Sequence, residues 1–246
     1  MFQCVLSQRF SAEYSGRPLD YYRNLRVTNP SNYLYFYDFG DYQIIGASPE
    51  SLVSVKQGQV TTNPIAGTRP RGKDEREDKA LAEELLADEK EVAEHRMLVD
   101  LGRNDIGKIA QNNSVEVTKY MEVEYFRYVM HLTSVVRGQL LPQLTAMDAL
   151  KSTLPAGTVS GAPKIRAMKR IYELEQEKRG VYAGAIGYLS ATGDMDFAIA
   201  IRTMVLKNGR AYVQAGAGIV YDSIPTNEYQ ETINKAKSMT KIGEMQ

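Results

Sequence analysis

Residues Gln214–Val220 read QAGAGIV, and they lead into a segment that carries Glu228 and Glu231. Glycine has no side chain, so backbone N–H groups beside it can approach an anionic ligand closely. Glutamates three residues apart share one face of a helix, where their carboxylates can bind a single cation. The pattern predicts a glycine loop that binds an acidic small molecule beside a helix that binds a divalent metal.

The same pattern occurs upstream, where Gly67–Arg69 precede Glu91 and Glu94. This loop offers a close backbone approach, a hydroxyl from Thr68 and arginines that can form paired hydrogen bonds with a ligand carboxylate. Read separately, it is equally well a basic surface loop, and each glutamate pair is more often a solvated helix face. Their joint occurrence favours a metal that bridges an acidic ligand to the protein.

A third segment of small residues, from Pro155 to Lys164, leads into a stretch with helical spacing. The N-terminus of a helix attracts anions because its N–H groups are free and its dipole is positive there. The spacing of Gly161 and Lys164 differs from that of a nucleotide P-loop. A tight loop without a ligand stays an alternative interpretation of this segment.

The composition excludes several classes of function. Among the 246 residues, 30 acidic and 30 basic side chains balance, so no overall field favours nucleic acid or a membrane surface. The single Cys4 excludes an internal disulfide and fits a reducing compartment, and no apolar run reaches the about 20 residues of a membrane span. We therefore expect a cytoplasmic protein. One cysteine and two histidines are too few for a zinc site, whereas many glutamates favour a hard cation.

The hydrophobic periodicity predicts an α+β protein in which antiparallel strands are interrupted by blocks of helix. Strands are expected at 5–8, 33–37, 42–47, 51–56, 59–63, 115–120, 128–140, 183–191, 195–206 and 211–217. Helices are expected at 74–109, 146–151, 163–176 and 225–242.

Taken together, several segments resemble the chorismate-utilising enzymes, most closely the large subunits of anthranilate synthases. They run in order along nearly the whole chain: 6–10 (LSQRF), 46–51 (GASPES), 64–69 (PIAGTR), 94–105 (EHRMLVDLGRND), 129–132 (VMHL), 157–164 (GTVSGAPK), 201–203 (IRT) and 214–220 (QAGAGIV). The resemblance implies that 1–246 form one chorismate-binding catalytic domain with the fold of that family, in which mostly antiparallel sheets are layered with flanking helices.

The resemblance also implies a reaction and a metal. Chorismate and ammonia, which a glutamine amidotransferase subunit supplies from glutamine, would give anthranilate and pyruvate with Mg2+. Glu94 and Glu231 match the metal ligands of the family, and Glu91 and Glu228 match residues that support them. A cation on the ring carboxylate would withdraw electron density and favour attack by a nucleophile on the ring.

The remaining site residues are likewise implied by the resemblance. Glu50 matches the general acid that protonates the departing ring hydroxyl, and His131 and Thr158 match residues near it. A protonated carboxyl suits this role because hydroxide is a poor leaving group. Without the resemblance, a lone histidine in an apolar strand, such as His131, is more often a hydrogen-bonded core residue. Arg202 is expected to pair with the pyruvyl carboxylate, and the positions that match substrate-binding residues are Gly67, Thr68, Tyr182, Arg202, Gly216, Ala217 and Gly218.

Two positions distinguish members of the family. Isochorismate and salicylate synthases carry a lysine where Gln3 stands, and large subunits of aminodeoxychorismate synthases often carry one where Ala66 stands. The absence of both lysines favours an external amine as nucleophile, and hence anthranilate as product. Two alternatives stay open: an aminodeoxychorismate synthase without the lysine, and a chorismate-binding module without turnover.

Complete large subunits of this family are longer than this chain, with an N-terminal region that shares a tryptophan pocket. We therefore expect the chain to be a fragment that lacks this region and contains only 29–34 (NPSNYL) of the pocket. Sheet edges that the missing region covers would then be open, which favours self-association into a homo-oligomer.

Overall fold

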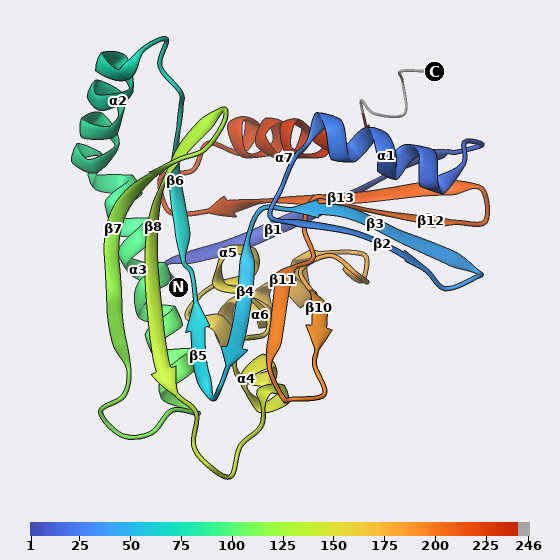
Figure 1. Cartoon of the computed structure of the whole chain (residues 1–246). Helices are drawn as coiled ribbons and strands as arrows, with labels where there is room; N and C mark the ends of the chain where they lie inside the picture. The colour runs from blue at the N-terminus through green and yellow to red at the C-terminus, as the bar shows by residue number, and fades with distance from the viewer. Residues whose placement is uncertain (241–246) are drawn as a thin grey trace. The chain divides into compact units, whose positions relative to one another are not determined.

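Antiparallel strands and blocks of helix alternate along residues 1–240, the part of the chain that the computed structural model describes (Figure 1). The α+β fold class is confirmed. By their internal contacts the residues divide into two compact units. The first unit comprises Met1–Glu50, Pro155–Ile186 and the described residues from Ala198 onward, and the second comprises Ser51–Leu154 and Gly187–Phe197. No helix within 1–240 is long and apolar enough to cross a membrane.

The first unit is built on a six-stranded sheet with the order β2-β3-β12-β13-β1-β9. Its strands are β1 (Gln3–Glu13), β2 (Tyr33–Asp38), β3 (Tyr42–Ser48), β9 (Gly161–Ala162), β12 (Thr203–Lys207) and β13 (Arg210–Ile219). The longest pairing joins the two ends of the chain, because β1 and β13 run antiparallel from Cys4 opposite Ile219 to Glu13 opposite Arg210. The N-terminal strand is therefore an inner strand of this sheet.

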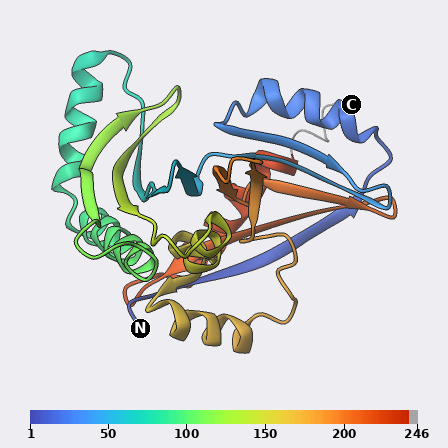
Figure 2. The same ribbon diagram turned by 60° about the horizontal axis from the view of Figure 1, so that its bottom comes forward.

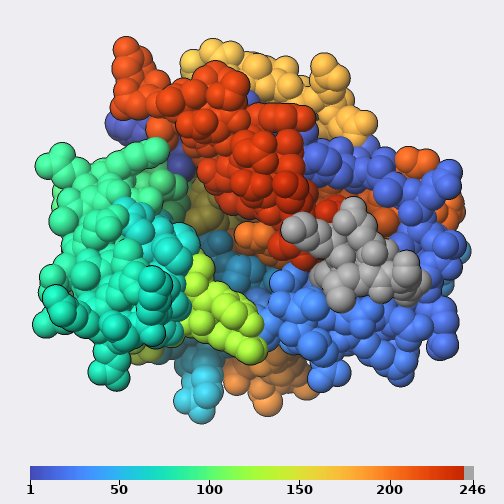
Figure 3. Space-filling model, turned by 90° about the horizontal axis from the view of Figure 1, so that it is seen from above, coloured from blue at the N-terminus to red at the C-terminus, as the bar shows by residue number. Residues whose placement is uncertain are grey.

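Four helices belong to the first unit: α1 (Pro18–Thr28), α5 (Gly157–Ser160), α6 (Lys164–Leu174) and α7 (Pro225–Thr240). Leu25 of α1 and Met239 of α7 are fully buried in one hydrophobic cluster with Ile45 of β3 and Met204 of β12, so these two helices cover the same face of the sheet. The outer side of α7 forms part of the surface in Figure 3, in red. Helix α6 packs against β1 (Figure 2).

The second unit contains the seven-stranded sheet with the order β10-β11-β4-β5-β8-β6, to which β7 is added beside β8. Its strands are β4 (Ser51–Lys56), β5 (Gln59–Thr62), β6 (Ile65–Pro70), β7 (Glu116–Tyr125), β8 (Val129–Gln139), β10 (Ala185–Leu189) and β11 (Met195–Ile199). Its helices are α2 (Glu75–Ala87), α3 (Glu89–Gly107) and α4 (Ala146–Thr153). Leu85 of α2 packs against Met130 and Leu132 of β8, which fixes α2 on this sheet.

Two elements that the periodicity predicts as continuous are interrupted. The expected helix 74–109 ends at Ala87 and begins again at Glu89, because Asp88 leaves the helical conformation and its carboxylate accepts hydrogen bonds from Lys90 N and Glu91 N. The expected strand 195–206 breaks between β11 and β12, where Arg202 has a positive φ of 50°. Both interruptions lie next to predicted site residues.

Two expected loops are strands. Gly216–Gly218 lie within β13 and pair with β1, so the expected strand 211–217 extends to Ile219 and the prediction of a glycine loop at 214–220 is wrong. Likewise Ile65–Pro70 form β6 beside β8, with a bulge at Gly67, whose φ is 71°. The glycines at these positions leave room for side chains of other elements. Helix α1 was not predicted.

Candidate functional site

The acid predicted at Glu50 lies where β3 ends, and its backbone oxygen accepts a hydrogen bond of 3.0 Å from Ile199 N. Thr158 of α5 donates its hydroxyl to Glu50 Oε1 at 2.9 Å. Glu50 is half-buried, and desolvation raises the pKa of its carboxyl to about 7, although the Thr158 hydrogen bond and the charge of Lys235 act in the opposite direction. The carboxyl can therefore hold and release a proton near neutral pH.

The glycines of β13 leave room for two side chains from other elements. A Cβ atom at Gly216 would lie 2.6 Å from Tyr182 Oη, and one at Gly218 would lie 2.6 Å from Gln3 Nε2. Strand β12 pairs with β13 only as far as Val213, so the glycines have a neighbouring strand on the β1 side alone. Ala217 is 1% exposed. The strand can therefore offer main-chain groups to a ligand along its other edge.

Arg202 contributes a buried positive charge. Its Nη1 donates to Lys235 O at 2.8 Å and to Ser238 Oγ at 2.7 Å, both on α7. Burial lowers the pKa of this guanidinium, and the charge of Tyr182 is the opposing influence. No carboxylate among residues 1–240 forms an ion pair with Arg202. A guanidinium buried without a protein carboxylate is suited to an anionic ligand.

The predicted metal residues of α7 already have partners. Glu228 Oε1 accepts a hydrogen bond of 2.8 Å from Ser223 Oγ, and Glu231 Oε1 lies 2.5 Å from Lys235 Nζ. The same Lys235 donates to the carbonyl of Gly216 at 3.2 Å, which ties α7 to β13. These contacts hold both carboxylates at defined places at the start of α7.

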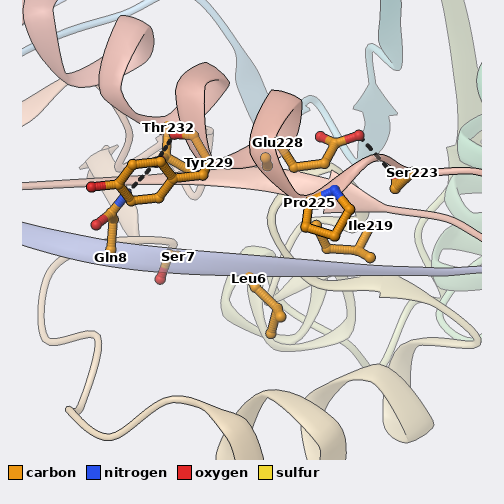
Figure 4. Close-up of a pocket in the computed structure, with 10 residues that line it drawn as sticks. Leu6, Ser7, Gln8, Ile219, Ser223, Pro225, Glu228, Tyr229 and Thr232 are labelled. Carbon is orange, nitrogen blue, oxygen red and sulfur yellow. Dashed lines mark hydrogen bonds between the residues drawn. The ribbon is translucent and has the colours of Figure 1, made fainter.

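Glu228 also lines a pocket of about 420 Å³ between the start of α7 and the β1–β13 pair. Figure 4 shows Glu228 and Ser223 at one end of this pocket, and Tyr229 with the Gln8–Thr232 contact at the other. The residues that line it are Leu6, Ser7, Gln8, Ala217, Ile219, Ser223, Pro225, Glu228, Tyr229 and Thr232. Two of these residues, Ala217 and Glu228, are also predicted site residues.

In the second unit, the bulge of β6 holds His131 of β8. Its Nδ1 lies 2.9 Å from Gly67 O and 3.0 Å from Thr68 Oγ1. A carbonyl oxygen only accepts, so Nδ1 carries a proton and Nε2 is the acceptor of the neutral ring. His131 is half-buried, and the structure brings it together with Gly67 and Thr68, as the resemblance implies.

Glu91 and Glu94 lie in the first turns of α3. Desolvation raises the pKa of Glu91, and the charge of Glu94 raises it further, whereas Arg69 lowers it. Gly67 lies close by, because a Cβ atom there would be 3.3 Å from Glu91 Oε2. The two carboxylates therefore repel each other, and a bound cation would reduce this repulsion.

The arginines after Gly67 bind the protein itself, which corrects the interpretation of this segment as a carboxylate-binding loop. Arg69 donates to Glu84 Oε1 at 2.9 Å and to Asp88 Oδ2 at 2.8 Å. Arg71 forms paired hydrogen bonds with Asp78, which lowers the pKa of that carboxyl. Both guanidinium groups therefore join the segment of β6 to the helices that follow. Contact of Gly67 and Thr68 with a ligand stays a prediction.

The carboxylates fit the Mg2+ that the resemblance implies. Oxygen ligands are those that Mg2+ prefers, and the charge of Glu94 raises the pKa of Glu91, although Arg69 Nη1 lies 3.7 Å from Glu91 Oε1. No group of three or more His, Cys, Asp or Glu side chains forms a metal cluster among residues 1–240. The pair Glu91–Glu94 belongs to the second unit and the pair Glu228–Glu231 to the first.

Sequence reasoning missed two residues of the site. Lys235 stands four residues after Glu231, the spacing of an ion pair on a helix face, so this signal was available. His95, next to Glu94, is fully buried with Nε2 2.6 Å from Ser134 Oγ, and burial lowers its pKa to about 4. It joins α3 to β8 as a neutral residue, and no pattern in the sequence indicates this role.

The chain matches known proteins over nearly its whole length. The profile of chorismate binding enzymes matches residues 1–241. Anthranilate synthase component 1 of Lactococcus lactis is 64% identical over 244 residues, which are 99% of this chain and 54% of that protein. The crystal structure of anthranilate synthase component I from Streptococcus pneumoniae is 84% identical, with a TM-score of 0.92 over 98% of this chain and 53% of that one.

The chain is also similar, at lower identity, to a protein with a different activity. The menaquinone-specific isochorismate synthase MenF of Escherichia coli is 27% identical, with a TM-score of 0.88 over 98% of this chain and 56% of that one. The chain spans about half the length of the relatives it matches. Because the family profile covers all but the last few residues, the chain belongs to the family of chorismate binding enzymes.

Proposed function

We propose that this chain carries the chorismate-converting site of an anthranilate synthase, which uses chorismate and ammonia to form anthranilate, pyruvate and water. The observation that carries the proposal is the half-buried Glu50 carboxyl, which accepts the hydrogen bond of Thr158 and whose pKa is raised to about 7. The similarity to anthranilate synthase components supports this choice within the family. In this reading the protein is a lyase of the cytoplasm.

Substrate binding is assigned to one positively charged side chain and to main-chain and side-chain polar groups. Arg202 pairs with the pyruvyl carboxylate, because its guanidinium is buried and lacks a protein carboxylate among residues 1–240. Main-chain groups of Gly216, Ala217 and Gly218, with the Tyr182 hydroxyl above Gly216, hold the polar groups of the ligand. Gly67, Thr68 and Nε2 of His131 supply the remaining contacts.

The acid step follows from the protonation state of Glu50. A carboxyl with a pKa near 7 keeps its proton over much of the neutral range, so Glu50 gives this proton to the ring hydroxyl as the C–O bond breaks and water leaves. Thr158 then donates its hydroxyl to the carboxylate that remains. Ammonia adds to the ring and loses a proton, and elimination of pyruvate together with a ring proton makes the ring aromatic.

Mg2+ is assigned to Glu94 and Glu231, with Glu91 and Glu228 as supporting residues. When bound, the cation withdraws electron density from the ring through its carboxylate. Lys235 keeps Glu231 charge-balanced before the cation binds. Ser223 orients Glu228 through its hydrogen bond to Oε1.

The test is to incubate the purified chain with chorismate, ammonium and Mg2+ and to follow the fluorescence of anthranilate. Chromatography of the same mixture separates anthranilate from 4-amino-4-deoxychorismate, so either aminated product is identified directly. Anthranilate as the main product supports the proposal. Accumulated aminodeoxychorismate would assign the chain to the other aminating activity, and tight chorismate binding without any product would make it a binding module.

A further inference from the structure

A buried ion pair lies beside the candidate site and has no part in the reaction proposed above. Arg179 Nη2 donates to Glu175 Oε1 at 2.6 Å and Arg179 Nε donates to Glu175 Oε2 at 2.9 Å. The two side chains are only 16% and 8% exposed. Taking such a pair out of water costs free energy, which further hydrogen bonds must offset.

Those hydrogen bonds reach two other elements of the first unit. Arg179 Nη1 donates to Val159 O of α5 at 2.6 Å, and Nη2 donates to Val5 O of β1 at 2.7 Å. Glu175 Oε1 accepts from both the amide and the hydroxyl of Ser7, each at 2.8 Å. The ion pair therefore fastens the segment after α6 to β1 and to α5 at the same time.

Both ends of this network touch residues of the candidate site. Val159 directly follows Thr158, whose hydroxyl binds Glu50. The Arg179 guanidinium also lies 5.4 Å from the centre of the Tyr182 ring, which is within the range of a cation–π contact. Tyr182 in turn approaches the backbone of Gly216 so closely that no Cβ atom would fit there.

We propose that Arg179 is a positioning residue that holds the Thr158 hydroxyl on Glu50 and the Tyr182 ring over β13. The proposal rests on the function proposed above for Glu50 and Tyr182. The guanidinium suits this role because its planar fork contacts a carboxylate, two carbonyl oxygens and an aromatic face at once. A lysine ammonium has the same charge and cannot make this set of contacts.

The test compares Arg179→Lys and Arg179→Met with Arg170→Met. Arg170 forms an ion pair with Glu173 on α6, but its side chain is 46% exposed and touches no residue of the site, so it is a matched control. With chorismate, ammonia and Mg2+ we expect Arg179→Lys to lower kcat by roughly 10- to 100-fold, which is less than the about 10²- to 10⁴-fold that loss of the general acid itself would cost. KM for chorismate should rise less than kcat falls, and apparent Mg2+ affinity should stay within twofold of the unmodified chain.

A second measurement needs neither substrate nor turnover. With glutamate labelled with 13C at the side-chain carboxyl, NMR follows the titration of Glu50, and Glu50→Gln identifies its signal. Loss of the Thr158 hydrogen bond raises the Glu50 pKa, so Thr158→Val sets the size of this shift. We expect Arg179→Lys and Arg179→Met to shift the pKa in the same direction, whereas Arg170→Met leaves it unchanged.

The two measurements separate this proposal from the proposed function. If the unmodified chain forms no anthranilate but the Arg179 variants still raise the Glu50 pKa, the proposed reaction is wrong and the positioning role stands. If Arg179→Lys folds with the unmodified Glu50 titration and kcat, Arg179 positions nothing. If Arg179→Met is too unstable to purify, Arg179→Lys decides the matter alone, because it keeps the charge beside Glu175.

Discussion

At the scale of single residues, Glu50 should control how activity depends on pH. Because its pKa is raised to about 7, kcat should fall as the pH rises through about 7 and the carboxyl loses its proton. Thr158→Val should move this fall to higher pH, since the threonine hydrogen bond lowers the pKa. Glu50→Gln should lower kcat by about 10²- to 10⁴-fold and abolish the dependence. Initial rates of anthranilate formation from pH 5.5 to 9 check these expectations.

The same carboxyl should make the fold less stable as the pH rises. The folded pKa of about 7 exceeds the ordinary value of 4.5, so the folded chain holds this proton more tightly than the unfolded chain does. The stabilising difference is present below about pH 4.5 and is lost as the pH rises to about 7. Urea unfolding should therefore show Glu50→Gln gaining stability relative to the unmodified chain between pH 5 and 8. An equal difference at both values would contradict the raised pKa.

Gly216 should tolerate no side chain. The Cβ atom of Gly216→Ala would lie 2.6 Å from Tyr182 Oη and 2.9 Å from Leu6 O, a backbone atom that cannot move easily. Such overpacking costs about 1 to 3 kcal/mol, and displacement of Tyr182 should raise KM for chorismate. Gly107→Ala is the control, since nothing lies within 4 Å of its added Cβ. Chorismate titrations of both variants measure the difference.

At the scale of elements, α3 and α7 each present one predicted metal ligand. Glu94→Gln and Glu231→Gln each remove an anionic oxygen ligand, so both should weaken apparent Mg2+ affinity by at least about tenfold. For Glu231→Gln the loss of its ion pair with Lys235 is a second change, and Lys235→Met tests that change separately. Activity measured across a Mg2+ titration gives the result. An unchanged titration in both glutamine variants would remove these residues from the metal site.

Asp88 joins two elements, because it ends α2 and caps the start of α3. Asp88→Ala would remove the hydrogen bonds to Lys90 N and Glu91 N as well as the Arg69 contact. We expect a loss of about 0.5 to 2 kcal/mol in the free energy of unfolding. Asp100→Ala, whose partner Arg103 is exposed, should cost less. Chemical denaturation of both variants compares the two aspartates, and equal losses would argue against the shared cap.

Single residues and single elements differ in how far they can be predicted from the sequence. Alternating apolar residues, together with turn residues such as Asn208–Gly209, locate most strands, and the glutamate spacing places each predicted metal pair on one helix. The glycines of β13 are misread as a loop because their function depends on Tyr182 and Gln3, which come from distant segments. Arg69 is misread as a ligand residue because Glu84 and Asp88 approach it only after the chain folds. Contacts between residues that lie far apart in the chain produce no local pattern in the sequence, so they cannot be predicted from it.

At the scale of the whole molecule, the source of nitrogen should depend on a partner. Cys4 is 4% exposed in β1, burial raises the pKa of its thiol, and no histidine contacts it, so it is unsuited to glutamine hydrolysis. The chain alone should use free ammonia, and glutamine should serve only when an amidotransferase subunit is added. Parallel assays with ammonium and with glutamine distinguish these cases. Glutamine-dependent anthranilate from the purified chain would contradict the prediction.

The pairing of β1 with β13 has a consequence for how the protein is made. Strand β1 finds its long antiparallel partner only after Arg210–Ile219 have been added. At about 5 to 20 residues per second, the ribosome needs on the order of 10 to 40 s to reach β13 after completing β1. During this interval one inner edge of the sheet is unpaired while the second unit emerges. Chaperones that shield exposed strands should therefore bind the nascent chain once β1 has emerged, and release it only after β13 has been added.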